Sequence, residues 1–143
     1  MSNIILIILF ALIFLILAYV LYIQNSQKQL FINLVSGDEV KSKMGLQFAA
    51  KELDLGIPVI IFLNADGVKL ALANDEILLQ HKLILKQLIQ IGAKVYVCAG
   101  CLKEYTDTLN KKVDYKIIDG IQIGNIEIIN QDLFKMNTKT LSW

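Results

Sequence analysis

The sequence predicts an α/β protein with a doubly wound, mostly parallel open sheet, helices on both faces of the sheet, and one transmembrane helix before it. Two observations predict the sheet. Apolar runs of strand length alternate with segments whose apolar residues recur at helical spacing. The run 57–63 is apolar throughout, as in a strand buried on both faces. The membrane helix is predicted by Ile4–Ile23, which has no charged residue and matches the ~20 residues that a bilayer crossing requires.

We expect the apolar run to be retained as an anchor. A secretory signal peptide usually has basic residues before its apolar core and small residues at its cleavage site. Residues 1–3 contain no Lys or Arg, and residues 21–24 offer no pair of small residues. The expected organisation is therefore a transmembrane anchor with a short linker over 1–29, followed by one α/β domain over 30–143.

Charge excludes one class of partner and leaves the membrane side open. The net charge of the 143 residues is +1, with both signs mixed along the chain. No basic face is evident, so nucleic acid is not an expected partner. Lys28 follows the apolar run, and by the positive-inside rule it favours a cytoplasmic domain. A single N-terminal anchor ahead of a folded domain is typical of a protein whose domain lies in the periplasm, and we favour this side of the membrane.

The expected helices and strands of the domain follow from the spacing of apolar residues along the chain. The expected order is a strand at 30–35, a helix at 39–55, a strand at 57–63, a helix at 77–91, a strand at 94–97, a helix ending near Asn110, a short strand or extended loop at 115–118, a helix at 125–134 and an edge strand at 138–143. Asp38 has N-cap chemistry for the first of these helices, and Gly56 ends it. Pro58 lies at the start of its strand, where a missing N–H is tolerated. Gly92 closes the next helix.

Polar and small residues interrupt the chain after three successive strands, at Ser36–Asp38, Asn64–Gly67 and Cys98–Cys101. In open α/β sheets, ligands and chemistry gather outside the carboxyl ends of the strands. We therefore expect these three breaks to line one edge. The candidate lining residues are Ser36, Asp38, Asn64, Asp66, Gly100 and Lys103.

Both cysteines, Cys98 and Cys101, lie in one turn with C-x-x-C spacing, directly after a strand rich in β-branched residues. A thiol between a strand and a helix lies near unpaired backbone N–H groups and the positive end of the helix dipole. These groups favour the thiolate, which is the nucleophilic form. Cys98 is the expected reactive thiol and Cys101 its modulator.

Four interpretations of this pair remain open. In the first, the cysteines are small buried apolar residues. In the second, they are half of a zinc site. The one histidine that could add a ligand is His81 in the second helix, which we expect to face solvent. A thioredoxin-type dithiol fits the spacing, although Pro58 precedes the motif. A nucleophilic cysteine that carries sulfur as a persulfide fits the same residues. No cofactor or metal is expected.

Several segments together resemble the DsrE/DsrF-like family of sulfur-relay proteins. The resemblance spans about residues 30–143 and is carried by four segments, 62–68, 92–101, 118–124 and 140–143. The combination of a strand-borne Val-Cys-x-x-Cys with a later Asp-Gly-x-x-Ile-Gly is the specific part.

The resemblance implies a doubly wound α/β domain that assembles as trimers or hexamers. It also implies that Cys98 accepts and passes on sulfane sulfur, since Cys98 matches the cysteine that ends the third strand. Cys101 matches a second cysteine found in some members. Together with the anchor predicted from Ile4–Ile23, the expected function is a membrane-anchored, sulfurtransferase-type carrier with unidentified donor and acceptor proteins. The alternative is a non-catalytic, oligomeric interaction module at the membrane.

Overall fold

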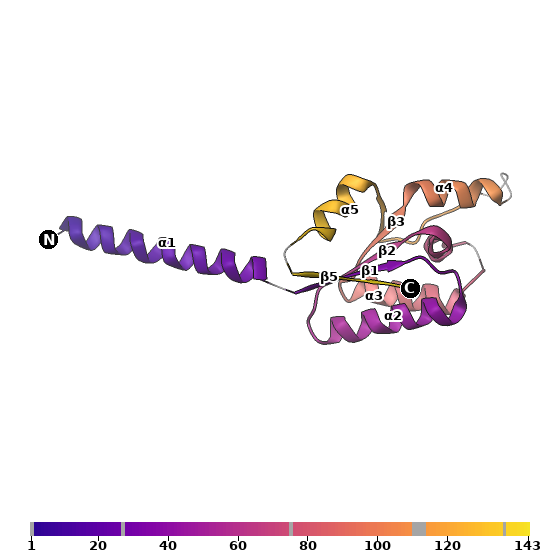
Figure 1. Cartoon of the computed structure of the whole chain (residues 1–143), viewed down its shortest axis with the longest axis horizontal. Coiled ribbons are helices and arrows are strands. Elements are labelled where there is room, and N and C mark those ends of the chain that lie inside the picture. Colours follow the sequence, from indigo (N-terminus) through magenta and orange to yellow (C-terminus); the bar gives the residue numbers. More distant parts are fainter. Residues whose placement is uncertain (1, 27, 75, 110–113, 136) are drawn as a thin grey trace.

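Five parallel strands form one open sheet in the order β4-β3-β2-β1-β5 (Figure 1). The computed structural model describes residues 2–26, 28–74, 76–109, 114–135 and 137–143. The elements are α1 (Ser2–Ser26), β1 (Gln29–Leu34), α2 (Glu39–Asp54), β2 (Val59–Leu63), the 3-10 helix η1 (Ala65–Ala71), α3 (Leu79–Gln90), β3 (Lys94–Cys98), α4 (Ala99–Thr108), β4 (Ile121–Gly124), α5 (Ile126–Leu133) and β5 (Thr138–Ser142).

The winding confirms the predicted fold class. The chain builds the sheet outward from β1 to β4, and α5 then returns it to the free side of β1, where β5 pairs in parallel. Helices α2 and α3 cover one face of the sheet, and α5 lies on the other (Figure 1). The edge strand predicted at 138–143 is therefore present as β5.

Successive side chains of a strand point to opposite faces of the sheet, so the strands contribute to a core layer on each face. Leu30, Ile32 and Leu34 of β1 belong to the larger cluster, which α2, α3 and η1 complete. Phe31, between them, faces the smaller cluster with Tyr96 and Ile129 of α5. Because both faces are packed, the central strand β2 is apolar at every position.

Side-chain caps fix where two of the helices begin. Asp38 Oδ1 accepts a hydrogen bond of 2.9 Å from the Lys41 N–H, as its predicted N-cap chemistry requires. Asn125 Oδ1 accepts one of 2.9 Å from the Ile128 N–H and starts α5.

Several local features add to or differ from the expected elements. Of the two alternatives for residues 115–118, the structure has the extended loop, in which only Ile117 makes an isolated bridge, to Leu72. The fourth strand is Ile121–Gly124, a segment for which the sequence predicts no strand. The segment after β2 is the 3-10 helix η1, for which the sequence predicts no element. The helix end predicted near Asn110 lies outside the described residues; α4 ends at Thr108.

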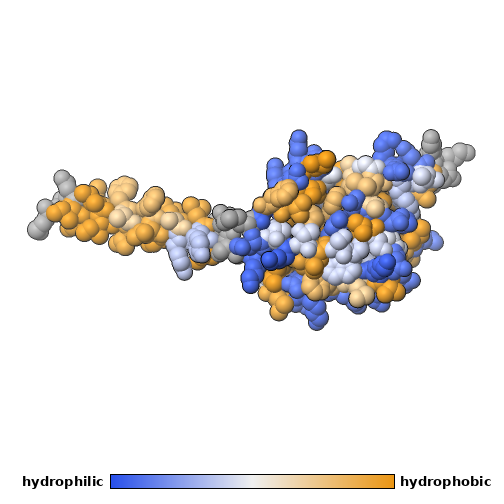
Figure 2. All heavy atoms as spheres, viewed as in Figure 1, coloured by the Kyte–Doolittle hydropathy of each residue, from blue (hydrophilic) through white to orange (hydrophobic). Residues whose placement is uncertain are grey.

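Helix α1 stands apart from the domain. Its stretch Ile4–Ile23 is long and apolar enough to cross a membrane, and none of it is buried against the rest of the chain. Figure 2 shows apolar side chains along the length of this helix. The helix therefore contributes nothing to the core of the domain.

Gly67 of η1 provides a test of how the sheet edge is built. A Cβ atom at this position would lie 2.1 Å from the carbonyl oxygen of Leu34, which is backbone and cannot turn away. We expect Gly67→Ala to destabilise the domain by about 2–3 kcal/mol or more, as overpacking does. Thermal unfolding in detergent should show a melting temperature about 8–12 °C lower.

Gly100→Ala is the matched control, because a Cβ atom at Gly100 meets nothing within 4 Å and Ala favours the helix. Its melting temperature should be unchanged or higher. Equal melting temperatures for Gly67→Ala and the unmodified chain would contradict the close packing of η1 on β1.

Candidate functional site

The two thiols meet at the junction of β3 and α4. Cys98 is the last residue of β3 and the N-cap of α4, and its Sγ accepts a hydrogen bond of 3.3 Å from the Cys101 N–H. The Sγ atom of Cys101 lies 2.7 Å from Cys98 Sγ, and both side chains are half-buried free thiols. Cys98 Sγ thus accepts the backbone N–H of Cys101, while its own thiol is directed at Cys101 Sγ. An anion on Cys98 Sγ keeps this backbone N–H as a donor.

Asn64, which follows β2, completes the cluster. Its Oδ1 lies 3.1 Å from Cys101 Sγ and also accepts a hydrogen bond of 2.8 Å from the Ala65 N–H. The S–H proton of Cys101 thus has two acceptors within reach, the amide oxygen and Cys98 Sγ. Burial raises the pKa of the Cys101 thiol, and the hydrogen bond to Cys98 raises this pKa further. The folded environment accordingly favours the neutral form of the Cys101 thiol.

The two cysteines open toward different hollows of the surface. Cys98 lines a cavity of about 560 Å³ between the start of α4 and the start of α5. Its lining residues are Phe62, Cys98, Ala99, Gly100, Gly124, Asn125, Ile126, Glu127, Ile129 and Asn130. Cys101 lines another, of about 450 Å³, with Ala65, Asp66, Glu104, Tyr105 and Thr108. A reactant can therefore approach Cys98 without passing over Cys101.

Three of the six predicted lining residues lie beside the thiols: Asn64 contacts Cys101, Asp66 shares its hollow, and Gly100 lines the cavity of Cys98. Ser36 and Asp38 lie on the same edge, but their side chains serve the backbone. Ser36 Oγ accepts the Asp38 N–H at 3.0 Å, and Asp38 caps α2. The side chains of these two residues therefore stabilise the loop and the start of α2, and neither contacts a cysteine sulfur through these hydrogen bonds.

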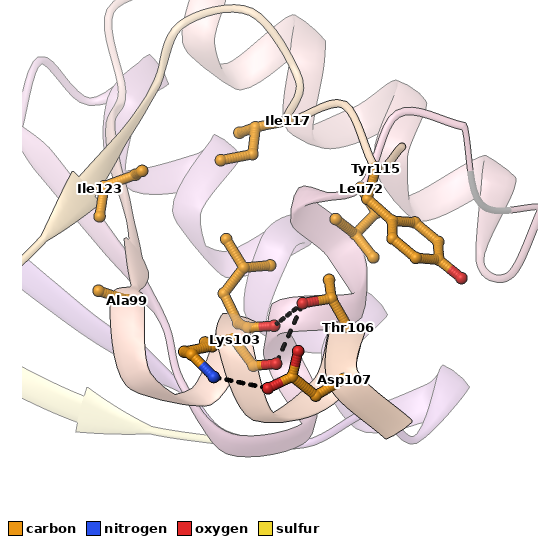
Figure 3. A pocket seen from close by; sticks show the side chains of 9 residues that line it. Leu72, Ala99, Lys103, Thr106, Asp107, Tyr115, Ile117 and Ile123 are labelled. Atoms are coloured by element: carbon orange, nitrogen blue, oxygen red, sulfur yellow. Dashed lines mark hydrogen bonds and ion pairs between the residues drawn. The ribbon is translucent and has the colours of Figure 1, made fainter. Parts of the chain in front are cut away.

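Lys103, the last of the six candidate lining residues, pairs with Asp107 at 2.6 Å and is mostly exposed. Figure 3 shows this ion pair on the wall of a third hollow of about 460 Å³, together with Thr106. Leu72, Ile117 and Ile123 supply its apolar side. The ammonium group of Lys103 therefore pairs with a carboxylate of its own helix.

Sequence reasoning missed the contribution of β4 and α5. Gly124 pairs with Cys98 across the sheet, and Asn125 then caps α5 at the mouth of the Cys98 cavity. The signal was present, since an alternating run that ends in Gly-Asn is typical of a strand followed by a turn. Tyr105 was also missed; it lines the hollow of Cys101 and lies under Lys69, whose Nζ is 5.6 Å from the ring centroid.

The geometry separates the open interpretations of the pair. Neither thiol is fully buried, so simple core packing does not describe them. His81, expected to face solvent, is 2% exposed, and its Nε2 lies 2.7 Å from the carbonyl oxygen of Glu39. Among the described residues, no group of three or more His, Cys, Asp or Glu side chains is placed to hold a metal. Pro58 precedes β2 and so lies at the opposite end of the sheet from Cys98.

Comparison with known proteins agrees with this architecture. The crystal structure of the YchN protein from E. coli superposes with a TM-score of 0.58 at 17% identity, over 81% of this chain and 99% of that chain. This similarity shows the fold. No curated protein matches the sequence. The model of the DsrE/DsrF-like family matches residues 27–132, which is well over half of the chain. The chain therefore belongs to the DsrE/DsrF-like family.

Proposed function

We propose that this chain is a membrane-anchored sulfur carrier in which Cys98 holds sulfane sulfur as a persulfide. The observation that carries the proposal is the position of Cys98 Sγ. It caps α4, accepts the Cys101 N–H at 3.3 Å, and lines a cavity of about 560 Å³. Backbone donors at a helix start stabilise a thiolate and, after loading, the anionic persulfide.

Loading requires no oxidant. The Cys98 thiolate attacks the outer sulfur of a donor persulfide, R–S–SH. The new bond joins Cys98 Sγ to that sulfur as the donor's own S–S bond breaks, and the donor leaves as a thiolate that takes up a proton. Delivery is the same exchange in reverse, with an acceptor nucleophile attacking the outer sulfur and Cys98 leaving as a thiolate.

Cys101 sets how long the persulfide lasts. As a thiolate, Cys101 would attack Cys98 Sγ, expel hydrosulfide and leave a Cys98–Cys101 disulfide, which an external dithiol must then reduce. As a neutral thiol it does not attack, and its proton instead stabilises the charge on Cys98. Because burial raises the pKa of the Cys101 thiol, the neutral form dominates near pH 7. Cys101 is thus a slow resolving thiol.

The membrane arrangement is part of the proposal. Ile4–Ile23 anchors the chain as a single-pass helix, and the domain faces the periplasm, where unidentified donor and acceptor proteins exchange sulfur with Cys98. The domain assembles as a homotrimer or hexamer, as the family resemblance implies.

One surface favours the second candidate function, an oligomeric interaction module. Val40, Met44 and Phe48 form an apolar stripe along α2, and each of them is exposed. Phe48 packs on Trp143 with ring centroids 5.4 Å apart, so the stripe continues to the end of the chain. An unpartnered apolar stripe of this kind marks a protein contact. This surface is compatible with a carrier and also sufficient for a module without chemistry.

The carrier is tested by sulfur loading. Incubating the unmodified full chain with a low-molecular-weight persulfide should add the mass of one sulfur atom, and Cys98→Ser should abolish the gain. Cys101→Ser is the matched control because it removes the neighbouring thiol only; it should load and then lose its sulfur more slowly. If the unmodified chain gains no sulfur, the interaction module is the better description. Equal loading in Cys98→Ser would exclude Cys98.

The raised pKa of Cys101 is tested by alkylation across pH. In Cys98→Ser the only thiol is Cys101, and burial, the larger cause of the shift, is retained. The midpoint of the rate profile should lie above that of the same variant unfolded in urea, because the folded environment penalises the thiolate. A midpoint equal to or below that of the unfolded chain would remove the basis for a protected persulfide.

The oligomer is tested with Met44→Lys. Met44 is 55% exposed, so the substitution leaves the core of one domain intact while it places a charge in the apolar stripe. Light scattering in detergent should show a higher-order assembly for the unmodified chain and a smaller particle for the variant. Sulfur loading of the variant should be unchanged. A monomeric unmodified chain at micromolar concentration would contradict the homo-oligomer.

A further inference from the structure

Three helices of the domain end in a large, exposed apolar residue. Leu55 follows α2, Ile91 follows α3 and Phe134 follows α5, each as the helix C-cap. Their exposed fractions are 74%, 58% and 77%. We call these three residues the apolar tips. A single exposed apolar residue is ordinary at a protein surface, whereas several gathered in one region mark an interaction site, so the question is where these three residues lie.

The topology brings the apolar tips to one end of the domain. Strands β1, β2 and β3 are parallel, and the helix between each pair must run back toward the amino end of the next strand. Helix α5 returns in the same way to β5. The C-terminal ends of α2, α3 and α5 therefore lie at the amino ends of the strands. Figure 1 shows that α1 joins the domain at this same end.

The connection to α1 is short. Two residues lie between the end of α1 at Ser26 and the start of β1 at Gln29, so the two ends are at most about 10 Å apart. The apolar run stops at Ile23, about 4.5 Å of helix before Ser26. The headgroup layer of one leaflet is about 5–8 Å thick. A bilayer spanned by Ile4–Ile23 is therefore within side-chain reach of this end of the domain.

We propose that Leu55, Ile91 and Phe134 dock the domain on the bilayer that α1 spans, with the apolar tips inserted at the headgroup level. The inference rests on the proposed membrane anchor, and it is independent of the sulfur chemistry. It fixes the orientation of the domain: the carboxyl edge of the sheet, with Cys98, points away from the membrane.

The charges around the tips indicate which kind of lipid surface fits. Lys94 and Lys135 lie at this end, but both are paired to the buried Asp132, at 2.7 and 2.6 Å. Asp54 and Asp119 are exposed at the same end. Lys28, which directly precedes β1, is exposed at this end as well. Three lysines thus face three aspartates, so the charges are balanced rather than basic. The fitting surface is a zwitterionic interface entered by apolar side chains, and anionic lipid is not required.

Fluorescent probes on the full chain test the docking. In a Cys98→Ser/Cys101→Ser background, one new cysteine at Phe134, Leu55, Ile126 or Ile13 carries an environment-sensitive nitrobenzoxadiazole label. Each protein is reconstituted into phosphatidylcholine vesicles, with and without spin-labelled lipid that quenches near the headgroups. Ile126 is the matched control, because it is 79% exposed and belongs to the same helix as Phe134, at its other end. The Ile13 probe reports on the anchor alone.

We expect lipid-borne quenching and a blue-shifted emission at positions 134 and 55. Position 126 should show neither and should be quenched by iodide from the water. If position 13 is quenched by lipid but 134 and 55 are not, the anchor stands and the docking is wrong. If position 13 is not quenched, the anchor fails and the docking with it. A last outcome is that the probes at 134 and 55 show no lipid quenching and are shielded from iodide in detergent as well. That result would mean that a second copy of the chain covers the apolar tips, and it would also overturn the proposal.

Discussion

The site depends on one residue that belongs to two elements at once. Cys98 closes β3 and caps α4, so the backbone of the sheet fixes where its sulfur lies and the helix decides what that sulfur contacts. The Cys101 N–H reaches Cys98 Sγ because the first turn of α4 brings it there. The same turn brings the Cys101 thiol to Cys98, and Asn64 reaches that thiol because β2 pairs with β3 in parallel. Parallel pairing is thus the constraint that assembles the site.

That constraint also explains how much could be predicted from the sequence. Long apolar runs such as Val59–Leu63 identify central strands, and their carboxyl ends must meet at one edge, so Asn64 and Cys98 could be placed together. The four-residue strand Ile121–Gly124 gave a weaker signal, because only Gly124 in it is buried. The sequence therefore suggests a strand as one alternative at 115–118, just before the real one.

Side-chain partners were harder to predict than strands. Ser36 and Asp38 have the right position for a site, but the start of α2 needs acceptors for its free N–H groups and takes both. Lys103 has Asp107 one helical turn away, a partner that the i,i+4 rule could have revealed. His81 lacked such a local sign, because the carbonyl oxygen that its Nε2 approaches belongs to Glu39, 42 residues earlier. Only the packing of α3 on α2 makes that pair.

A fully parallel sheet also gives the domain two chemically distinct ends. The amino ends of the strands carry the connection to α1 and the apolar tips, and the carboxyl ends carry the thiols. The six residues of β1 separate these ends by about 20 Å at ~3.3 Å per residue. With the proposed anchor in a bilayer, Cys98 lies beyond the headgroups, where the aqueous phase begins and a soluble partner can reach it. Anchoring at the amino ends therefore leaves the thiol edge free, whereas an anchor after β5 would emerge beside that edge, because parallel strands end together.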